Sequence, residues 1–408
     1  MRVLFLVPHP IEGASSRYRV LQYIPHLEAQ GISCTVSSFL SSGFYRIIYQ
    51  KGRWGKKLGY FLVSTLRRLR DVLRSGRYDA VFVHLEAFPL GPPLIEWLLS
   101  LRHIPVVFDL DDAIFLPQRS GTNRAVNWLR ASQKLPAILR WSRCVITCND
   151  YLRDYVRQFN PNVYVIPTSV DTHTFVPVPT RHRQKPVIGW IGSHSTTPYL
   201  HSLKQVLRRV ADRHAFALKV VGASEPFQVS GVDVIQEPWT LAKDVLHFQD
   251  LDVGVYPLPN DPWVLGKTGF KTVQYMAVGV PCVVSRVGRN CEIIEDGVNG
   301  FLAGSEDEWV QKLGQLLEDP ALRRRLGAAG RKTVEERFSL HRQIPLYLEV
   351  LQRVTQKPVS RLLPSGLDPI AGQQVEFGQL AAGPARRTVQ TEMTHEGDAN
   401  ILKMEPNA

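Results

Sequence analysis

Short apolar runs alternate with amphipathic stretches along most of the chain. Residues 3–7 and 187–191 have the continuous apolar character of buried strands. Further strands are expected at 33–37, 80–83, 106–109, 143–147, 217–221, 232–235, 253–256 and 282–285. Stretches with apolar residues at helical spacing include 18–29, 94–101, 149–159 and 200–213. Because strands that alternate with helices form parallel sheets covered on both faces, the pattern predicts an α/β fold with doubly wound parallel sheets.

The alternation occurs in two series, which predicts two Rossmann-like domains facing a cleft. A chain of 408 residues exceeds what one core usually supports. We expect an N-terminal domain at 1–175, a polar, Pro-containing linker at 176–186 and a C-terminal domain at 187–340. A helix at 341–358 is expected to return to the N-terminal domain, and the Gly-, Pro- and Gln-rich tail at 359–408 to be disordered. Ligands of such folds bind at the carboxyl ends of strands.

The net charge of +12 predicts an acidic partner, and the excess is concentrated at 44–77. Ten cations lie there against Asp71 alone: Arg46, Lys51, Arg53, Lys56, Lys57, Arg67, Arg68, Arg70, Arg74 and Arg77. Leu, Phe and Val recur at helical spacing on the opposite face. We expect the apolar face to pack on the sheet and the basic face to be attracted to an anionic membrane surface. Nucleic acid is the rival partner, but no recognisable motif supports it, so none is expected.

Cysteine content and apolar runs bear on localisation. The five cysteines are scattered, which favours a reducing compartment over a disulfide framework. The first apolar run ends at Pro8 and is too short for a signal peptide, and no run has the length of a membrane span. We expect a cytoplasmic protein, or one bound peripherally to the inner face of the membrane.

Residues 266–284, GKTGFKTVQYMAVGVPCVV, place two lysines among glycines at the start of an apolar helix. Glycine permits close backbone approach to a ligand, and a helix start offers unpaired N–H groups and positive partial charge. Lys267 and Lys271 add two ammonium groups, which together predict a phosphate site. The alternative is a solvated lysine pair at an ordinary loop-to-helix junction.

The segments YMAVGVPCVVS and EIIEDGVNGFLA resemble the C-terminal signature of glycosyltransferase family 4, which has the GT-B fold. ASSRYRVLQYIPHLEAQGI, VITCNDYL and VIPTSVDTHTF agree with it, and FDLDDAIF and PLPNDPWVLGKTGFK are similar to bacterial envelope and exopolysaccharide glycosyltransferases. The resemblance covers residues 1–355 in element order. It implies transfer of a sugar, with retention, from a nucleotide-diphosphate sugar to a glycan or lipid-linked acceptor in polysaccharide biosynthesis. It also implies that the donor binds to the C-terminal domain, that the acceptor binds to the N-terminal domain, and that neither metal nor cofactor is needed.

The chain departs from the family at its Glu-x7-Glu motif, where Gly266 and Gln274 stand instead. Gln274 retains the ability to hydrogen-bond a ribose hydroxyl, whereas Gly266 cannot grip the donor by a side chain. The resemblance places Gly269 on the family's loop glycine, so that the N–H groups of Gly269 and Phe270 are expected to reach the sugar or diphosphate. The family's cations after the first C-terminal strand are absent from GWIGSHSTTPYL. Lys267 is therefore the first candidate to neutralise the leaving diphosphate, with Lys271 the second.

Other donor-side candidates are weaker. Gly192, Ser193 and Ser195 follow a strand and are expected to form a companion phosphate nest, with an ordinary tight turn as the alternative. Glu292 falls in the family's EII turn, where it is expected to touch the donor or to cap a helix.

Acidic residues end a strand on the acceptor side. Asp109, Asp111 and Asp112 are candidates, and Asp111 or Asp112 is expected to orient the acceptor hydroxyl or take its proton. Metal binding and helix capping are the alternatives. Further acceptor-side candidates are Gly13, Arg17, Arg19, His84 and Glu86. The two arginines are expected to contact a diphosphate or to be ordinary surface residues.

Two other function classes fit the same fold. One is a GT-B epimerase or phosphorylase, which the absence of a lysine in a recognisable pyridoxal-phosphate context disfavours. The other is a non-catalytic nucleotide-sugar-binding protein, because both motif glutamates are replaced. Retained lysines and aspartates at the cleft favour an enzyme.

Overall fold

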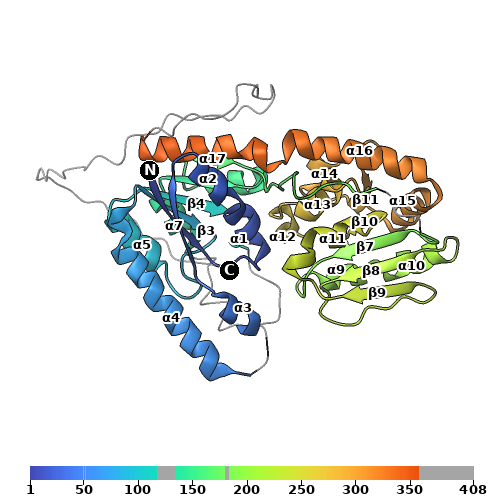
Figure 1. Cartoon of the computed structure of the whole chain (residues 1–408), viewed down its shortest axis with the longest axis horizontal. Coiled ribbons are helices and arrows are strands. Elements are labelled where there is room, and N and C mark those ends of the chain that lie inside the picture. Colours follow the sequence, from blue (N-terminus) through green and yellow to red (C-terminus); the bar gives the residue numbers. More distant parts are fainter. Residues whose placement is uncertain (49, 51, 117–133, 180–182, 358–408) are drawn as a thin grey trace, which may run out of the picture. The chain divides into compact units, whose positions relative to one another are not determined.

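The computed structural model describes residues 1–48, 50, 52–116, 134–179 and 183–357 (Figure 1). These residues belong to one compact unit, so the predicted division into two domains with a linker at 176–186 stays a prediction. The tail at 359–408 lies outside the described residues. Within the described ranges, no helix combines the length and apolar character needed to cross a membrane.

The described strands form two sheets, and every pairing between neighbouring strands is parallel. The first has the order β2-β1-β3-β4-β5-β6, and the second has the order β12-β11-β10-β7-β8-β9. The first contains β1 (Arg2–Val7), β2 (Ser33–Ser38), β3 (Ala80–His84), β4 (Val106–Leu110), β5 (Cys144–Thr147) and β6 (Val163–Val165). The second contains β7 (Val187–Ile191), β8 (Ala217–Val221), β9 (Asp233–Glu237), β10 (Val253–Tyr256), β11 (Cys282–Ser285) and β12 (Phe301–Ala303). The predicted doubly wound α/β architecture is confirmed.

Helices cover both faces of the first sheet because its central strands are apolar on both sides. Val3 and Phe5 of β1 share a core with α2 (Ile24–Ala29) and α17 (Leu340–Thr355), whereas Leu4 and Leu6 share one with α5 (Leu94–Leu101) and α8 (Asp150–Arg157). The other described helices of this half are α1 (Ala14–Arg19), α3 (Ser42–Ile48), α4 (Trp54–Leu73) and α7 (Leu135–Trp141). The helix α17 thus packs on the first sheet.

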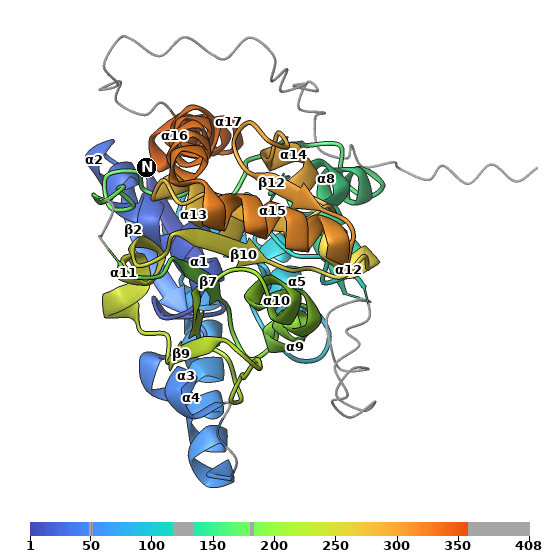
Figure 2. The same ribbon diagram turned by 90° about the vertical axis from the view of Figure 1, so that its right-hand side faces the viewer.

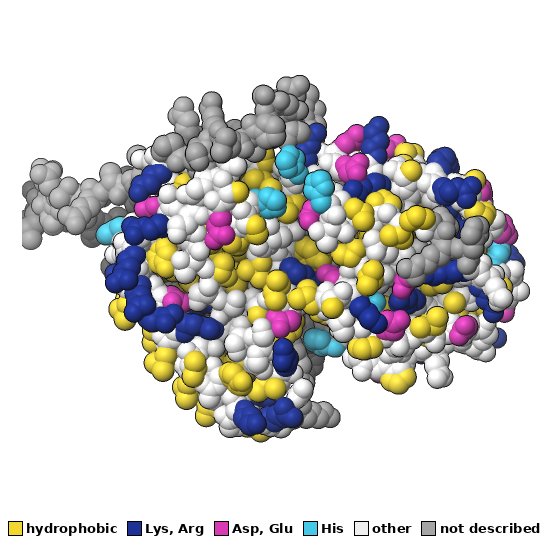
Figure 3. All heavy atoms as spheres, in the orientation of Figure 1, with side chains coloured by type: hydrophobic (Ala, Val, Ile, Leu, Met, Phe, Trp, Pro, Cys, Tyr) yellow, Lys and Arg dark blue, Asp and Glu magenta, His cyan; other side chains and the backbone are white. Residues whose placement is uncertain are grey.

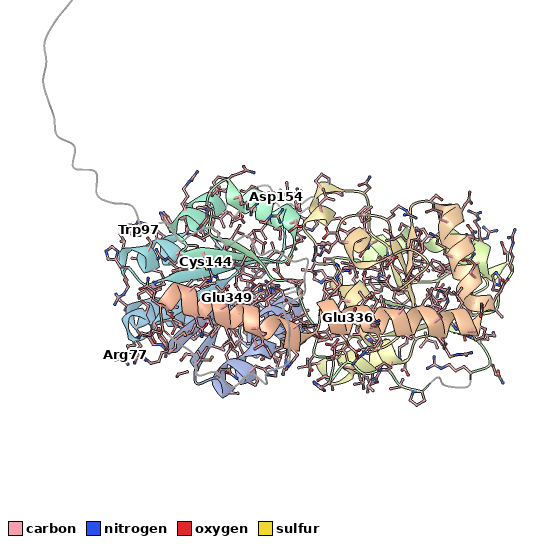
Figure 4. All side chains as sticks on the ribbon, turned by 90° about the horizontal axis from the view of Figure 1, so that it is seen from above. Arg77, Trp97, Cys144, Asp154, Glu336 and Glu349 are labelled. Carbon is pink, nitrogen blue, oxygen red and sulfur yellow. The ribbon has the colours of Figure 1, made fainter. Side chains whose placement is uncertain are left out.

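The second sheet is covered in the same way, as Figure 2 shows for α10 and α11 on either side of β7. Trp190 and Val220 pack against α10 (Lys204–Ala211) and α15 (Glu306–Glu318), whereas Ile191 and Val221 pack against α11 (Asp244–Gln249) and α13 (Phe270–Ala277). Other described helices here are α9 (Thr197–His201), α12 (Pro262–Leu265), α14 (Asn290–Ile293) and α16 (Pro320–Arg337). Figure 4 shows α16 and α17, which carry Glu336 and Glu349, lying in line.

Two predicted helices differ in detail. The stretch 18–29 begins earlier, as α1, and is interrupted by a 3₁₀ turn at Leu21–Tyr23 before α2, whose first turn contains Pro25. The stretch 200–213 is divided into α9 and α10. Pro25 fits the start of α2 because proline has no N–H to lose at a first helical turn.

The orientation of α4 contradicts the sequence-based expectation. Its leucine stripe faces outward, with Leu62, Leu66 and Leu73 more than half exposed, while Arg68 is buried. The Arg68 guanidinium donates to the carbonyls of Val7 and Ser37, at 3.1 Å each, and Arg67 donates to the carbonyl of Phe39 at 2.9 Å. These two arginines therefore bind the carboxyl ends of β1 and β2. Of the apolar positions on α4, Val72 packs on the sheet, whereas the leucine stripe does not.

The fit between α16 and α13 depends on a glycine. A Cβ atom at Gly327 would lie 2.0 Å from the carbonyl oxygen of Gly279, a backbone atom that cannot move without distorting the turn after α13. We expect Gly327→Ala to lower the free energy of unfolding by about 1–3 kcal/mol, as overpacking does in other proteins. Urea unfolding followed by circular dichroism measures this effect.

Gly59→Ala is the matched control, because Gly59 also lies within a helix but has open space around its Cβ position. Replacing a helical glycine with alanine there is expected to stabilise slightly, by up to about 1 kcal/mol. Equal effects of the two substitutions would show that the close approach at Gly327 is not restrictive.

Candidate active site

A cavity of about 770 Å³ lies at the carboxyl ends of strands from both sheets. Its wall includes the segment after β1, the end of β4 and the loops after β7 and β10. In each sheet the strand order reverses here, between β1 and β3 and between β7 and β10. Such switch points are where parallel sheets leave a crevice for a ligand. The site is therefore formed by the topology that the sequence predicted.

Basic side chains line one part of the cavity. Lys267 and Lys271 are both in its wall, together with Arg17 from α1. Lys267 Nζ lies 5.8 Å from the centre of the Trp263 ring. Lys271 Nζ donates to Gln274 Oε1 at 3.0 Å, and burial lowers the pKa of Lys271 to about 8. These groups give the cavity the positive charge that an anionic ligand requires.

Gly266 is explained by the segment that follows β4. A Cβ atom at this position would lie 2.4 Å from the Cβ atom and 2.9 Å from the backbone nitrogen of Ala113. Asn149 holds the same loop, donating through Nδ2 to the carbonyls of Leu265 at 3.2 Å and Lys267 at 3.3 Å. The space that a glutamate side chain would need at 266 is thus filled by the neighbour of Asp112.

The start of α13 differs from the expected diphosphate cradle. Gly269 has a φ of +65°, which favours glycine, but it does not line the cavity. Phe270 lines it, yet its N–H donates to Thr268 Oγ1 at 3.3 Å. Gln274 lines it and donates through Nε2 to the hydroxyl of Tyr18 at 3.2 Å. Of the two residues whose N–H groups were expected to reach the diphosphate, Phe270 thus lines the cavity and Gly269 does not.

The loop after β7 contributes two of its three predicted residues. Gly192 and Ser193 line the cavity, whereas Ser195 is exposed and does not. The Ser193 N–H donates to Thr196 Oγ1 at 2.9 Å. A Cβ atom at Gly192 would lie 2.2 Å from the Trp190 ring, so only glycine fits there.

The acidic part of the wall consists of Asp111 and Asp112. Asp111 Oδ2 accepts from Ser15 Oγ at 2.8 Å, and Asp111 Oδ1 is buried without a hydrogen-bond partner in the described part of the chain. Burial raises the pKa of Asp112, the charge of Lys267 lowers it, and the charge of Asp111 raises it. The resulting pKa is about 6. Asp112 is therefore able to change protonation state near neutral pH.

Three predicted acceptor-side residues form a buried cluster behind this wall. Arg19 and Asp109 form a fully buried ion pair in which Arg19 Nε donates to Asp109 Oδ2 at 3.1 Å. His84 Nδ1 lies 2.7 Å from the same oxygen. Neither Arg19, Asp109 nor His84 lines the cavity, so Arg19 is not placed to contact a diphosphate. Its remaining donors are occupied inside the protein, as by the Ile166 carbonyl at 2.7 Å.

The other candidates also lie outside the cavity wall. Gly13 is buried at the start of α1, packed against His9. Glu86 pairs with Lys134 at 3.1 Å. Glu292 lies on α14 with an exposed side chain that pairs with Arg289, so it neither touches the cavity nor caps the helix with its side chain.

Sequence inspection missed a cluster centred on Asp244. Asp244 Oδ2 accepts from the Tyr18 hydroxyl at 2.6 Å and from Arg17 Nη2 at 3.1 Å, and Oδ1 accepts from Trp239 Nε1 at 3.0 Å. All four residues line the cavity. Asp244 lies 227 positions from Arg17, and no local motif in the sequence links them.

Comparison with known proteins assigns the family. Residues 18–174 match the family model "Glycosyltransferase Family 4" and residues 185–319 match "Glycosyl transferases group 1", which together cover well over half of the chain. The chain belongs to glycosyltransferase family 4.

Particular proteins share parts of the sequence or the fold. N-acetyl-alpha-D-glucosaminyl L-malate synthase of Bacillus anthracis is 35% identical over 81 residues, 19% of this chain and 21% of that protein. The match therefore spans about a fifth of the relative's length. Sucrose-phosphate synthase of Thermosynechococcus elongatus has a TM-score of 0.63 at 17% identity, covering 87% of this chain and 99% of that one. HepE of Anabaena, solved with UDP-glucose, has a TM-score of 0.63 at 16% identity, covering 86% and 100%. These solved structures support the GT-B fold.

The charge coupling between Lys267 and Asp112 is testable. Lys267 lowers the pKa of Asp112, so Lys267→Met should raise that pKa above its value of about 6. Carboxyl ¹³C NMR between about pH 4 and pH 8 measures the titration, with Asp112→Asn assigning the signal. Lys332→Met, at an exposed lysine on α16, is the control and should leave the titration unchanged. A pKa that falls or stays constant in Lys267→Met would contradict the placement of Lys267 opposite Asp112.

Proposed function

We propose that the protein transfers a sugar, with retention, from a nucleotide-diphosphate sugar to a hydroxyl of a glycan or lipid-linked acceptor. The observation that carries this proposal is a cavity whose wall contains both lysines from the second half of the chain and aspartates from the first. A glycosyl transfer needs both, because negative charge develops on the departing phosphate while the acceptor hydroxyl loses a proton. Envelope polysaccharide synthesis is the proposed setting.

The donor side is proposed to comprise Gly192, Ser193, Lys267, Lys271 and Gln274. Lys267 is not held by a carboxylate ion pair in the described structure, and it lies close enough to Asp112 to influence its charge. It is therefore the group best placed to stabilise the leaving diphosphate. The Anabaena protein of similar fold was solved with UDP-glucose, and the Bacillus relative is named for a glucosaminyl product, which supports a nucleotide sugar as the donor.

The acceptor side is proposed to lie at Asp111 and Asp112. Asp111 has a buried oxygen without a partner, and Asp112 has a pKa near 6. Either carboxylate is chemically able to orient a hydroxyl and take its proton. No cofactor or metal is part of the proposal.

The direct test is incubation with a panel of nucleotide sugars, scored for release of nucleoside diphosphate and for labelled glycan or glycolipid. Release that depends on an added acceptor is the expected result. Nucleotide-sugar binding without turnover of any donor would favour the non-catalytic alternative.

We expect Lys267→Ala to lower kcat roughly a hundredfold, about 3 kcal/mol of barrier, because an electrostatic stabiliser of the transition state is lost. Steady-state kinetics with the identified donor measures the change. Lys332→Ala serves as the control, since its side chain is exposed on α16 and pairs weakly with Glu336 at 3.9 Å. Full activity in a folded Lys267→Ala protein would refute the assignment.

We further propose that the protein binds an anionic membrane surface through α4 and α5. The outward stripe of α4 consists of Trp54, Leu58, Leu62, Leu66, Leu69 and Leu73. The neighbouring α5 adds Leu94, Trp97 and Leu101, each more than 40% exposed. Figure 3 shows hydrophobic side chains together with Lys and Arg over α4, and Figure 4 shows Trp97 and Arg77 at the outer edge of this half.

The charges around this face favour a lipid surface, rather than an apolar protein surface, as its binding partner. Its exposed cations are Arg53, Lys56, Arg70, Arg74 and Arg77. Leucine and tryptophan side chains bordered by such cations are typical of helices that lie in a membrane interface. Each cation near an anionic surface contributes about 1 kcal/mol, screened by salt.

We expect Arg70→Glu/Arg74→Glu to weaken binding to phosphatidylglycerol vesicles roughly tenfold or more, because two attractive charges become repulsive. Leu62→Ser/Leu66→Ser should weaken it too, but with less dependence on salt. Co-sedimentation at low and high salt measures both effects.

Arg324→Glu/Arg325→Glu is the matched control, because both arginines are exposed on α16 in the other half of the chain. If the control weakens binding as much as the α4 variant does, net charge rather than the α4–α5 surface attracts the vesicles. Failure of the wild type to co-sediment at low salt would refute membrane binding.

A further inference from the structure

Ser15 connects the acidic wall of the cavity to the buried cluster behind it. Its Oγ atom lies 2.6 Å from His84 Nε2 and 2.8 Å from Asp111 Oδ2. The other ring nitrogen of His84, Nδ1, lies 2.7 Å from Asp109 Oδ2. An unbroken hydrogen-bonded chain therefore runs from Asp109 through His84 and Ser15 to Asp111.

The inner end of the chain has a defined protonation. Burial alone would raise the pKa of Asp109, but Arg19 and His84 hold this pKa below its usual range. Asp109 is therefore an ionised carboxylate, which accepts hydrogen bonds and donates none. It follows that the hydrogen on the Asp109–His84 contact belongs to His84 Nδ1.

The two contacts of Ser15 then require one hydrogen each. The Ser15 hydroxyl provides only one, so the second must reside on His84 Nε2 or on Asp111 Oδ2. Without it, two lone pairs would face each other at hydrogen-bond distance in a partly buried site, which is costly. We propose that Ser15, His84 and Asp111 share one additional proton, and that its position, exchanged between the histidine and the aspartate through Ser15, decides whether Asp111 can act as a base in sugar transfer.

This role rests on the proposed transferase function. When the shared proton is on His84, Ser15 donates to Asp111 Oδ2 and Asp111 is a carboxylate whose Oδ1 has no partner among the described residues. The acceptor oxygen then bonds to the anomeric carbon on the face from which the phosphate departs, so that configuration is retained. The bond from that carbon to the phosphate oxygen breaks, with its electron pair leaving on the nucleoside diphosphate. The acceptor proton moves to the Asp111 carboxylate and passes to water after the product departs. When the shared proton is on Asp111, the carboxyl cannot act as a base.

The order Ser15–His84–Asp109 also matches a Ser-His-Asp hydrolase. In such an enzyme the serine oxygen attacks a substrate and forms an oxyanion nearby. Here the Asp111 carboxyl lies 2.8 Å from Ser15 Oγ, where its charge would oppose an anionic intermediate. The geometry therefore favours proton transfer over nucleophilic attack.

Other titratable groups influence the chain. They are Arg19 on α1, His9, Asp112 and Cys148 in the segments after β1, β4 and β5, and Tyr347 on α17. Burial and the charge of His84 lower the pKa of His9 to about 4, so His9 is neutral at pH 7. Because these groups also affect the pH profile, a change in the profile is assigned to the proton chain only when substitution of Ser15 itself produces it.

The shared proton is tested by ¹⁵N NMR of ring-labelled histidine, with His84→Gln identifying the signals. In the wild type we expect Nδ1 to be protonated and Nε2 to have a shift between the protonated and unprotonated limits. Ser15→Ala breaks the chain and should move Nε2 to one limit, while Ser15→Thr, which keeps the hydroxyl, should restore the wild-type shift. An Nε2 signal that is identical in the wild type and Ser15→Ala would overturn the shared proton.

Kinetics test the role in transfer. Ser15→Ala should lower kcat roughly a hundredfold and shift the pH profile of kcat, with the KM for the nucleotide sugar unchanged, and Ser15→Thr should recover most of the rate. Ser230→Ala, at an exposed turn, is the control. An unaltered rate and profile in Ser15→Ala would refute the relay. A wild type that turns over no nucleotide sugar would instead refute the proposed function, while the NMR comparison would still decide whether the proton is shared.

Discussion

The buried ion pair between Arg19 and Asp109 connects more of the first half than any other contact described above. Asp109 ends β4, and Arg19 ends α1 and also donates to the carbonyl after β6. The Arg19 carbonyl in turn accepts from the hydroxyl of Tyr347 on α17 at 2.8 Å. Because both charges are fully desolvated, loss of either partner would leave an uncompensated buried charge, a change that typically costs 3–5 kcal/mol. The pair thus fixes the position of His84, and through Ser15 that of Asp111.

The loops that contain Gly266 and Gly192, on the proposed donor side, are positioned by steric contacts rather than by ion pairs. Ala113 fills the space beside Gly266, and the Trp190 ring fills the space beside Gly192, so neither loop can carry a larger residue without moving. Lys267 and the loop after β7 are therefore positioned by backbone packing against neighbouring segments. The replacement of a family glutamate by Gly266 is, on this view, a consequence of the acidic segment after β4 approaching the loop.

Polar contacts join the residues of the two sheets across the cavity. Tyr18 and Arg17 contact Asp244, and Gln274 contacts Tyr18, so the first helix after β1 and two helices of the second half meet in one hydrogen-bonded cluster. A ligand that contacts Arg17, Lys271 or Gln274 would have to compete with these contacts or extend them.

The sequence by itself determined the strands, the alternation with helices, and the position of Asp111, Asp112, Lys267, Lys271 and Gln274 at the cavity. These follow from short-range patterns, since apolar runs specify buried strands and the carboxyl ends of parallel strands meet at one edge. The family signature also consists of contiguous residues, and it predicted the GT-B fold.

Only the tertiary structure decided which side of α4 faces outward, and which polar groups meet. Helical periodicity reveals an apolar stripe on α4 but not whether protein covers it, and here the buried positions are taken by Ser64, Arg68, Asp71 and Val72. Ser15 and Asp111 are 96 positions apart, and Arg17 and Asp244 are 227 apart. Glu292 matched the family motif locally, yet the path of α14 turns its side chain to solvent. Contacts over such separations are set by strand order and by the packing of loops, neither of which a local pattern contains.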